Sequence, residues 1–77
     1  MSNATLYTKD DCPYCVRAKR LLEEKGIDYI EINAPLHKDL MIKRIVDLGH
    51  PAPRTVPQIF LDEEYVGGFT ELAAKLK

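Results

Sequence analysis

The feature that most constrains the fold is a pair of cysteines, separated by two residues, at the point where a strand-like segment gives way to a helical pattern. Thr5–Thr8 is rich in β-branched and aromatic residues and predicts a strand. From Pro13 to Lys25 apolar residues recur at helical spacing, and Gly26 supplies a stop signal. Proline suits the first helical position because its missing N–H would have no partner there. The sequence therefore places the cysteines at the start of a helix that follows a strand.

The rest of the chain continues the alternation of strands and helices. Leu36–Leu48 predicts a helix whose apolar side carries Leu40, Met41, Ile45 and Leu48. Alternating or apolar runs predict strands at Asp28–Ile32, Gln58–Leu61 and Glu64–Val66, and a short last helix at Thr70–Leu76. The β-α-β opening implies a parallel strand pair, whereas the tight turn before the last strand implies an antiparallel hairpin. We expect an α/β fold in a single domain, residues 1–77, with a four-stranded mixed sheet flanked by three helices in the order βαβαββα.

Size and charge limit the classes of function that the chain can perform. With 77 residues there is room for one hydrophobic core. Eleven Lys and Arg balance twelve Asp and Glu, for a formal charge of −1, so no strong field attracts nucleic acid or an anionic membrane. No apolar run is long enough to span a bilayer, and no secretory signal pattern opens the sequence. We therefore expect a soluble, cytoplasmic monomer without nucleic-acid or membrane partners.

The spacing and position of Cys12 and Cys15 favour reversible thiol chemistry. Two intervening residues at a helix start allow the Cα separation that a disulfide needs. The helix dipole and the unpaired N–H groups stabilise a thiolate at Cys12, which makes it the expected nucleophile. Cys15, one turn inside the helix, is expected to be more buried and to attack the mixed disulfide. Lys9 adds positive charge nearby, and Asp10 and Asp11 oppose it.

Two other interpretations of the cysteine pair are weaker. Cys-x-x-Cys is half of a structural zinc site, but His37 and His50 would have to complete it, and they lie further apart than the roughly three to five residues of a zinc finger. An inert buried pair is disfavoured because Pro13 and Tyr14 sit where the helix begins. We therefore expect no metal site.

Thr55-Val56-Pro57 forms a second signal just before an apolar strand. Proline cannot donate to a central sheet ladder, so Pro57 must occupy a strand start, an edge or a cis turn. Such a position would leave the backbone N–H and C=O of Val56 free to pair with an extended thiol peptide, although a plain loop proline is an open alternative. Gly67-Gly68 also has two readings, because it is either only a turn or a place where a ligand approaches the backbone closely.

Together these segments resemble the dithiol glutaredoxins in both order and spacing. The resemblance covers nearly the whole chain and rests on Tyr7-Thr8-Lys9 before Cys12-Pro13-Tyr14-Cys15, then Thr55-Val56-Pro57-Gln58-Ile59-Phe60, then Gly67-Gly68. It implies a thioredoxin-like fold. It also implies an enzyme that reduces protein disulfides and glutathione mixed disulfides, with glutathione as co-substrate and no tightly bound cofactor.

The resemblance assigns roles to individual residues. It makes Cys12 the nucleophile, Cys15 the resolving cysteine and Pro57 a cis-proline facing them. Lys9 would lie near the glycine carboxylate of glutathione, and Val56 would pair with its cysteinyl backbone. The other residues of the implied glutathione site are Tyr14, Thr55, Gly68, Phe69 and Thr70. Thr70 is equally a candidate N-cap of the last helix, and Arg44 or Arg54 would either reach the glycine carboxylate or remain solvated surface charges.

Two alternative functions fit parts of the pattern. The short segment after Gly67-Gly68 resembles the small redoxins that donate electrons to ribonucleotide reductase and receive them from thioredoxin reductase. Some glutaredoxins instead hold a [2Fe–2S] cluster between two subunits with one active-site cysteine from each, but the resemblance implies that such proteins usually lack a proline at the position of Pro13. The electron source separates the first alternative from a glutaredoxin, and a coloured dimeric preparation would indicate the second.

Overall fold

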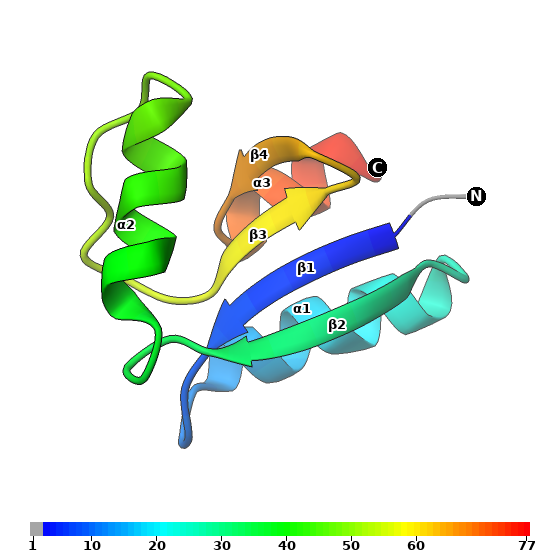
Figure 1. The fold of residues 1–77 in the computed structure, drawn as a ribbon. Coiled ribbons are helices and arrows are strands. Elements are labelled where there is room, and N and C mark those ends of the chain that lie inside the picture. Colours follow the sequence, from blue (N-terminus) through cyan, green and yellow to red (C-terminus); the bar gives the residue numbers. More distant parts are fainter. Residues whose placement is uncertain (1–2) are drawn as a thin grey trace.

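The computed structural model describes residues 3–77 and contains one sheet and three helices over that range (Figure 1). The elements are β1 (Asn3–Thr8), α1 (Pro13–Glu24), β2 (Asp28–Asn33), α2 (Lys38–Asp47), β3 (Gln58–Leu61), β4 (Glu64–Gly67) and α3 (Phe69–Lys75). Their order confirms the predicted succession βαβαββα.

The sheet is mixed, as predicted, and its strands run in the order β2-β1-β3-β4. β1 and β2 are parallel, with Leu6 opposite Glu31 and Thr8 opposite Asn33. β1 pairs antiparallel with β3, and β3 pairs antiparallel with β4. The two central strands are therefore β1, which leads into the cysteine pair, and β3, which follows Pro57.

One face of the sheet packs against α1 and α3, which lie side by side behind it in Figure 1. Leu6 of β1 lies directly opposite Ile59 of β3. Side chains of directly opposite residues point to the same face of a sheet, so the two meet in this core. Ala18 and Leu22, one turn apart on α1, and Leu72 of α3 close this core and are fully buried. This packing fixes the start of α1, and with it the cysteines, against the ends of β1 and β3.

The opposite face of the sheet is covered by α2. Met41 and Ile45, one helical turn apart, pack on Tyr7 and Phe60. The Tyr7 and Phe60 rings meet edge to face with their centroids 6.1 Å apart. The guanidinium of Arg44 lies 3.9 Å from the centroid of the Phe60 ring, which is a cation–π contact. Phe60 therefore joins α2 to the centre of the sheet.

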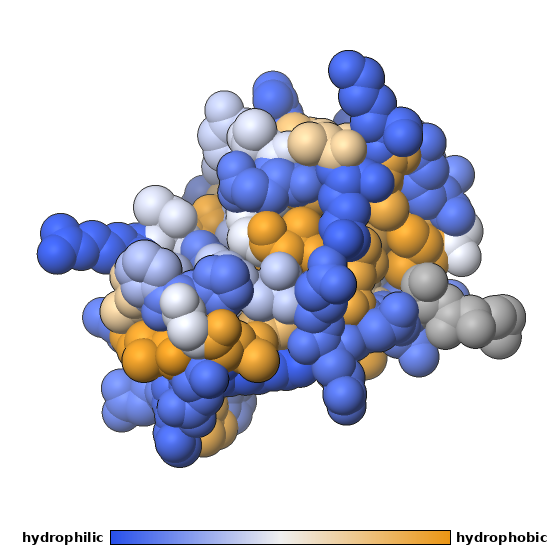
Figure 2. All heavy atoms as spheres, turned by 90° about the horizontal axis from the view of Figure 1, so that it is seen from above, coloured by the Kyte–Doolittle hydropathy of each residue, from blue (hydrophilic) through white to orange (hydrophobic). Residues whose placement is uncertain are grey.

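The apolar side of α2 differs from the prediction. Met41 and Ile45 face the sheet, but Leu40 is 64% exposed and Leu48 is 49% exposed. The prediction that these two leucines share the buried side is wrong, because apolar residues occur on more than one side of this helix and only one stripe meets the sheet. Seen from above, an orange apolar patch lies on the side of the molecule where α2 stands, bordered by blue hydrophilic side chains (Figure 2).

The helix α2 also begins later than predicted, at Lys38 instead of Leu36. The side chain of Asn33 explains this start, because its Oδ1 accepts a hydrogen bond of 2.9 Å from the Leu36 N–H. Such a bond holds the backbone after β2 in a turn and delays the first helical residue.

Candidate active site

The start of α1 positions the two cysteines. Asp11 has a φ of 57°, a left-handed conformation that Asp tolerates, and the turn leads into Cys12 as the N-cap residue. The N–H of Cys15 donates to the Cys12 Sγ across 3.1 Å. The two Cα atoms lie 5.2 Å apart, and the sulfurs are joined in a disulfide. Cys12 is 8% exposed and Cys15 is 2% exposed, so Cys12 is the more accessible of the two, as predicted.

The electrostatics of this helix start favour negative charge on the Cys12 sulfur. The first turn of α1 contains no acidic residue that would occupy the unpaired N–H groups. The positive end of the helix dipole therefore acts on Cys12, whose sulfur already accepts the N–H of Cys15. In the reduced protein these two effects stabilise a thiolate at Cys12 more than at Cys15, which lies inside the helix.

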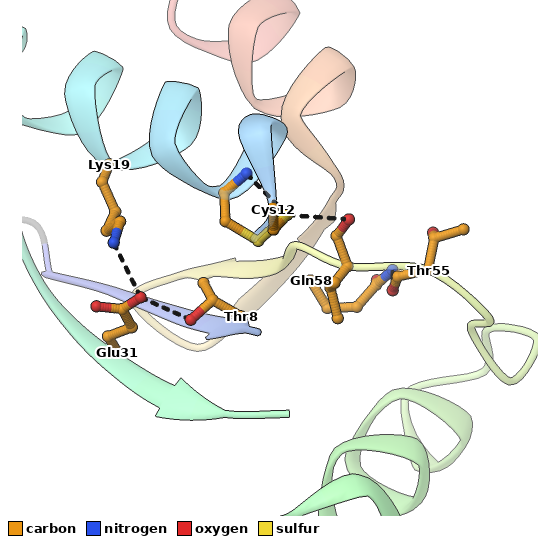
Figure 3. Close-up of a disulfide and its surroundings, with 8 residues drawn as sticks. Thr8, Cys12, Lys19, Glu31, Thr55 and Gln58 are labelled. Carbon is orange, nitrogen blue, oxygen red and sulfur yellow. Dashed lines mark hydrogen bonds and ion pairs between the residues drawn. A yellow bond between two sulfur atoms is a disulfide. The ribbon is translucent and has the colours of Figure 1, made fainter. Parts of the chain in front are cut away.

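The segment before β3 lies against the disulfide (Figure 3). The carbonyl oxygen of Val56 is 3.9 Å from the Cys12 Sγ. The Val56–Pro57 peptide bond is cis, as the resemblance implied, and Pro57 is buried. On its other side this segment approaches the double glycine, because a Cβ added to Gly68 would lie 3.6 Å from the Pro57 carbonyl oxygen. The two sequence signals and the cysteine pair therefore converge at one place.

A hydrogen-bond network that the sequence analysis missed holds the Thr55–Pro57 turn. The Gln58 Nε2 donates a hydrogen bond of 2.7 Å to the Thr55 carbonyl oxygen (Figure 3). The Tyr65 hydroxyl donates a hydrogen bond to the Gln58 Oε1. Gln58 is only 4% exposed, so its amide depends on these partners. Burial, followed by the charge of Glu71, raises the pKa of Tyr65, which keeps its hydroxyl a donor. The sequence signal that could have indicated this network is Gln58 itself, a polar residue at the start of the otherwise apolar strand β3.

The first turn of α3 differs from the prediction for Thr70. Gly68 is the N-cap, Phe69 is the first helical residue, and Thr70 lies exposed in the first turn, so the N-cap assignment to Thr70 is wrong. The Gly68 N–H instead donates 2.8 Å to the Glu71 Oε1. Gly67 has a φ of 117°, and a Cβ there would lie 3.0 Å from the same carboxylate oxygen. The backbone conformation at Gly67 therefore requires glycine.

Two aromatic side chains flank the cysteines on the α3 side. The rings of Tyr14 and Phe69 lie with their centroids 6.0 Å apart. Tyr14 is 54% exposed, and the Arg17 guanidinium lies 5.2 Å from its ring centroid. The pair forms a partly exposed apolar wall that joins the start of α1 to the start of α3.

Cavities lie on the other side of the cysteines, and Lys9 borders both of them. One, of about 600 Å³, is lined by Cys12, Cys15 and Lys19 among others. The second, of about 760 Å³, is lined by Thr55 and Val56 among others. Arg54 also lines this second cavity, whereas Arg44 lies over Phe60 on α2. Of the residues proposed from the sequence, Lys9 thus lines the smaller cavity together with both cysteines, and Val56 lies next to the Cys12 sulfur.

A polar cluster beneath the cysteines was also missed. The Thr8 hydroxyl donates a hydrogen bond of 2.6 Å to the Glu31 Oε2, and the Lys19 Nζ donates one of 3.1 Å to the same oxygen (Figure 3). These two hydrogen bonds, that of Thr8 first, hold the pKa of the Glu31 carboxyl below its ordinary value. Glu31 lines the smaller cavity together with both cysteines. The sequence gives no direct signal of this cluster, because it forms only when β2 pairs with β1.

Replacing Glu31 with glutamine should lower the free energy of unfolding at pH 7 by about 0.5–1 kcal/mol, because the carboxylate is 41% exposed and solvent screens its ion pair. A pKa that is lower in the folded state stabilises the fold above the unfolded pKa, and this contribution disappears as the pH falls through the folded pKa. The free energies of unfolding of Glu31→Gln and wild type, measured with urea, should therefore differ at pH 7, and the difference should shrink as the pH falls below the ordinary pKa of a glutamate. Glu24→Gln, an exposed change at the end of α1, is the control. A difference that persists unchanged in acid would contradict this account.

Within residues 3–77, His, Cys, Asp and Glu side chains form no group of three or more that could hold a metal ion. The ring of His50, one of the two residues considered for zinc, packs against that of Tyr65 at a tilt of 56°, with the centroids 4.7 Å apart. None of the helices over the same range is long and apolar enough to cross a membrane.

Comparison with known proteins decides the family. The family model described as Glutaredoxin matches residues 4–66. The chain belongs to the glutaredoxin family. Glutaredoxin 3 of Escherichia coli strain K12 is 44% identical over 78 residues, covering 96% of this chain and 86% of that protein. The crystal structure of glutaredoxin 1 from Francisella tularensis complexed with cacodylate has a TM-score of 0.77 at 38% identity, covering 99% of this chain and 93% of that chain.

A buckwheat glutaredoxin–glutathione complex also matches, with a TM-score of 0.74 at 27% identity, over 97% of this chain and 68% of that chain. This glutaredoxin therefore has the thioredoxin-like fold, with Cys12 and Cys15 as its two active-site cysteines. It is a dithiol, glutathione-dependent disulfide oxidoreductase.

Proposed function

We propose that this glutaredoxin reduces both protein disulfides and glutathione mixed disulfides, with Cys12 as the attacking thiolate and Cys15 as the resolving thiol. One observation carries the proposal: the Cys12 sulfur sits at the N-cap of α1, accepts the Cys15 N–H and lies 3.9 Å from the Val56 carbonyl oxygen. An attacking sulfur in this position has a stabilised thiolate and a neighbouring strand-like backbone on which to align a substrate.

The reaction proceeds by two thiol–disulfide exchanges. The Cys12 thiolate attacks one sulfur of the substrate disulfide, forms a mixed disulfide and expels the other sulfur as a thiolate, which takes up a proton. Cys15 then loses its proton and attacks the Cys12 sulfur as a thiolate. This step closes the Cys12–Cys15 disulfide and expels the second substrate sulfur as a thiolate, which takes up a proton. The 5.2 Å between the two Cα atoms lies within the range that a disulfide requires.

Two glutathione molecules return the enzyme to its dithiol form. The first glutathione thiolate attacks the Cys12 sulfur and displaces the Cys15 thiolate. The second attacks the sulfur of the bound glutathione, which forms oxidised glutathione and restores the Cys12 thiolate. In the first of these steps Cys15 leaves as a thiolate and takes up a proton. The N–H groups of α1 stabilise Cys12 as the leaving thiolate in the second step.

The glutathione moiety would lie across the surface between the larger cavity and α3. Val56 would pair with its cysteinyl backbone, next to Thr55 and the cis-bonded Pro57, and Lys9 at the cavity border would meet its glycine carboxylate. The γ-glutamyl end would lie over Gly68, Phe69 and Thr70, with Tyr14 beside Phe69. In this orientation of glutathione the negative glycine carboxylate lies next to Lys9, which is an exposed cation.

Kinetics of a lysine variant test this orientation. Lys9→Ala should raise the KM for a glutathione mixed disulfide about fivefold, because one partly exposed charge pair to the glycine carboxylate contributes about 1 kcal/mol. The control is Lys25→Ala, which removes an exposed lysine at the far end of α1 and should leave KM unchanged. Equal KM values for wild type and Lys9→Ala would remove Lys9 from the proposed site.

We also infer a cytoplasmic location, because a dithiol that must be reduced after each cycle suits a compartment where thiols are kept reduced.

A further inference from the structure

The larger cavity is a groove near the attacking cysteine, and the charged side chains that line it are all positive. It lies between the start of α2 and the loop that leads from α2 to β3, two segments that approach each other in Figure 1. Its charged lining residues are Lys9, Lys38 and Arg54, and no Asp or Glu lines it. Most of its other lining side chains are those of Ala, Pro, Met, Ile and Val. The groove thus combines an apolar floor with three cations.

The three cations are available to a ligand. Each is exposed, and none takes part in an ion pair among residues 3–77, where the ion pairs join Lys19 with Glu31, Lys43 with Asp47, and Lys75 with Glu64. Asp10 and Asp11 follow Lys9 in sequence but line the smaller cavity. An anion that entered the groove would therefore meet three cations that form no ion pair with a carboxylate of residues 3–77.

The groove is larger than glutathione requires at this end. Its volume of about 760 Å³ is comparable with complete small-molecule sites, which span about 300–1,000 Å³. In the proposed orientation the cysteinyl backbone of glutathione lies at the edge of the groove, against Val56, and only the glycine residue extends further into it, next to Lys9. The rest of the groove is lined by Lys38, at the start of α2, and by Arg54, in the loop before β3. This part of the groove has room for a chain longer than glutathione.

We propose that this groove selects protein substrates whose reactive cysteine is followed by acidic residues, and that Lys38 and Arg54 bind those carboxylates. The inference rests on the proposed function, because it uses the pairing of the substrate backbone with Val56. When a peptide replaces glutathione there, the residues after its cysteine continue in the direction of the glycine, over the groove. The specificity applies to the peptide whose sulfur Cys12 attacks, since that peptide occupies the site in the mixed disulfide.

Symmetric peptide disulfides test the proposal without ambiguity over which half is bound. Three acetylated, amidated peptides carry one cysteine followed by two glutamates, two glutamines or two lysines, and each is oxidised to its homodimer. Each turnover consumes one peptide disulfide and two glutathiones and yields two peptide thiols and oxidised glutathione, which glutathione reductase returns with NADPH. The rate of NADPH oxidation, corrected for the reaction without enzyme, gives kcat/KM for each peptide.

Wild type should prefer the glutamate peptide to the glutamine peptide by about three- to tenfold, as expected for two partly exposed ion pairs. K38Q/R54Q should reduce this ratio to about one, and K38E/R54E should invert it in favour of the lysine peptide. The matched control is R20Q/K25Q, which removes one Arg and one Lys from exposed positions of α1 and its C-cap and should keep the wild-type ratio.

Two results would overturn the inference while leaving the proposed function intact: equal turnover of all three peptides by wild type, or a glutamate preference that survives in K38Q/R54Q. Absence of turnover for every peptide disulfide would instead overturn the proposed reduction of protein disulfides itself, and the inference with it.

Discussion

A Cys15→Ser variant should lose reduction of peptide and protein disulfides but keep reduction of glutathione mixed disulfides, whereas Cys12→Ser should lose both by at least about a thousandfold. Without Cys15 the mixed disulfide on Cys12 has no internal thiol to resolve it, but a second glutathione can still attack it. Without Cys12 no thiolate sits at the start of α1. Cys15 cannot replace it, because it is 2% exposed and lies one turn inside the helix.

Differences in activity between Cys12→Ser and Cys15→Ser should report on thiol chemistry, because serine disturbs the fold little at either position. Serine differs from cysteine by one atom, and at the N-cap its hydroxyl can accept the N–H that now reaches the Cys12 sulfur. Both variants should be assayed on a disulfide-bonded protein and on a glutathione mixed disulfide of a small thiol, with glutathione and glutathione reductase. Protein-disulfide reduction at the wild-type rate by Cys15→Ser would contradict the role of Cys15 as the resolving thiol.

The second large effect concerns stability and Phe60. Phe60→Ala should lower the free energy of unfolding by about 3–5 kcal/mol, the usual cost of truncating a buried phenylalanine. Phe60 is 0% exposed, packs in the cluster that holds Met41 and Ile45, and carries the cation–π contact with Arg44. A chain of 77 residues has a total stability of only about 4–12 kcal/mol, so this single change removes a large share of it.

Urea unfolding followed by circular dichroism measures this loss. Phe60→Leu keeps most of the apolar volume and should cost clearly less than Phe60→Ala, which separates the cavity from the loss of the ring itself. Because α2 covers this face of the sheet only through this cluster and its neighbours, amide exchange in α2 should rise more than in α1. A loss below about 1 kcal/mol in Phe60→Ala would contradict the assigned role of Phe60.

The element order and the chemistry of the cysteines could be predicted because their signals are local. Helical spacing after Pro13, the stop at Gly26 and the tight turn between β3 and β4 each depend on a few neighbouring residues. The cis bond before Pro57 followed from the family resemblance and not from the residues themselves, which left a plain loop proline open.

The features that were missed depend on contacts between distant segments. Glu31 reaches Thr8 and Lys19 only after β2 has paired with β1, and Gln58 meets Tyr65 only across the β3–β4 hairpin. For α2, the spacing of apolar residues did not decide which stripe meets the sheet, so Leu40 was placed on the wrong side. A pattern along one helix identifies that helix, but its orientation is set by its partner.

The measurement that tests the central claim most directly is the turnover of a glutathione mixed disulfide with two electron sources in parallel, glutathione with glutathione reductase and thioredoxin reductase alone. The account predicts NADPH oxidation with the glutathione system for wild type and its loss in Cys12→Ser. Turnover by wild type only with thioredoxin reductase, or undiminished turnover by Cys12→Ser, would contradict a glutathione-dependent enzyme that works through the cysteine at the start of α1.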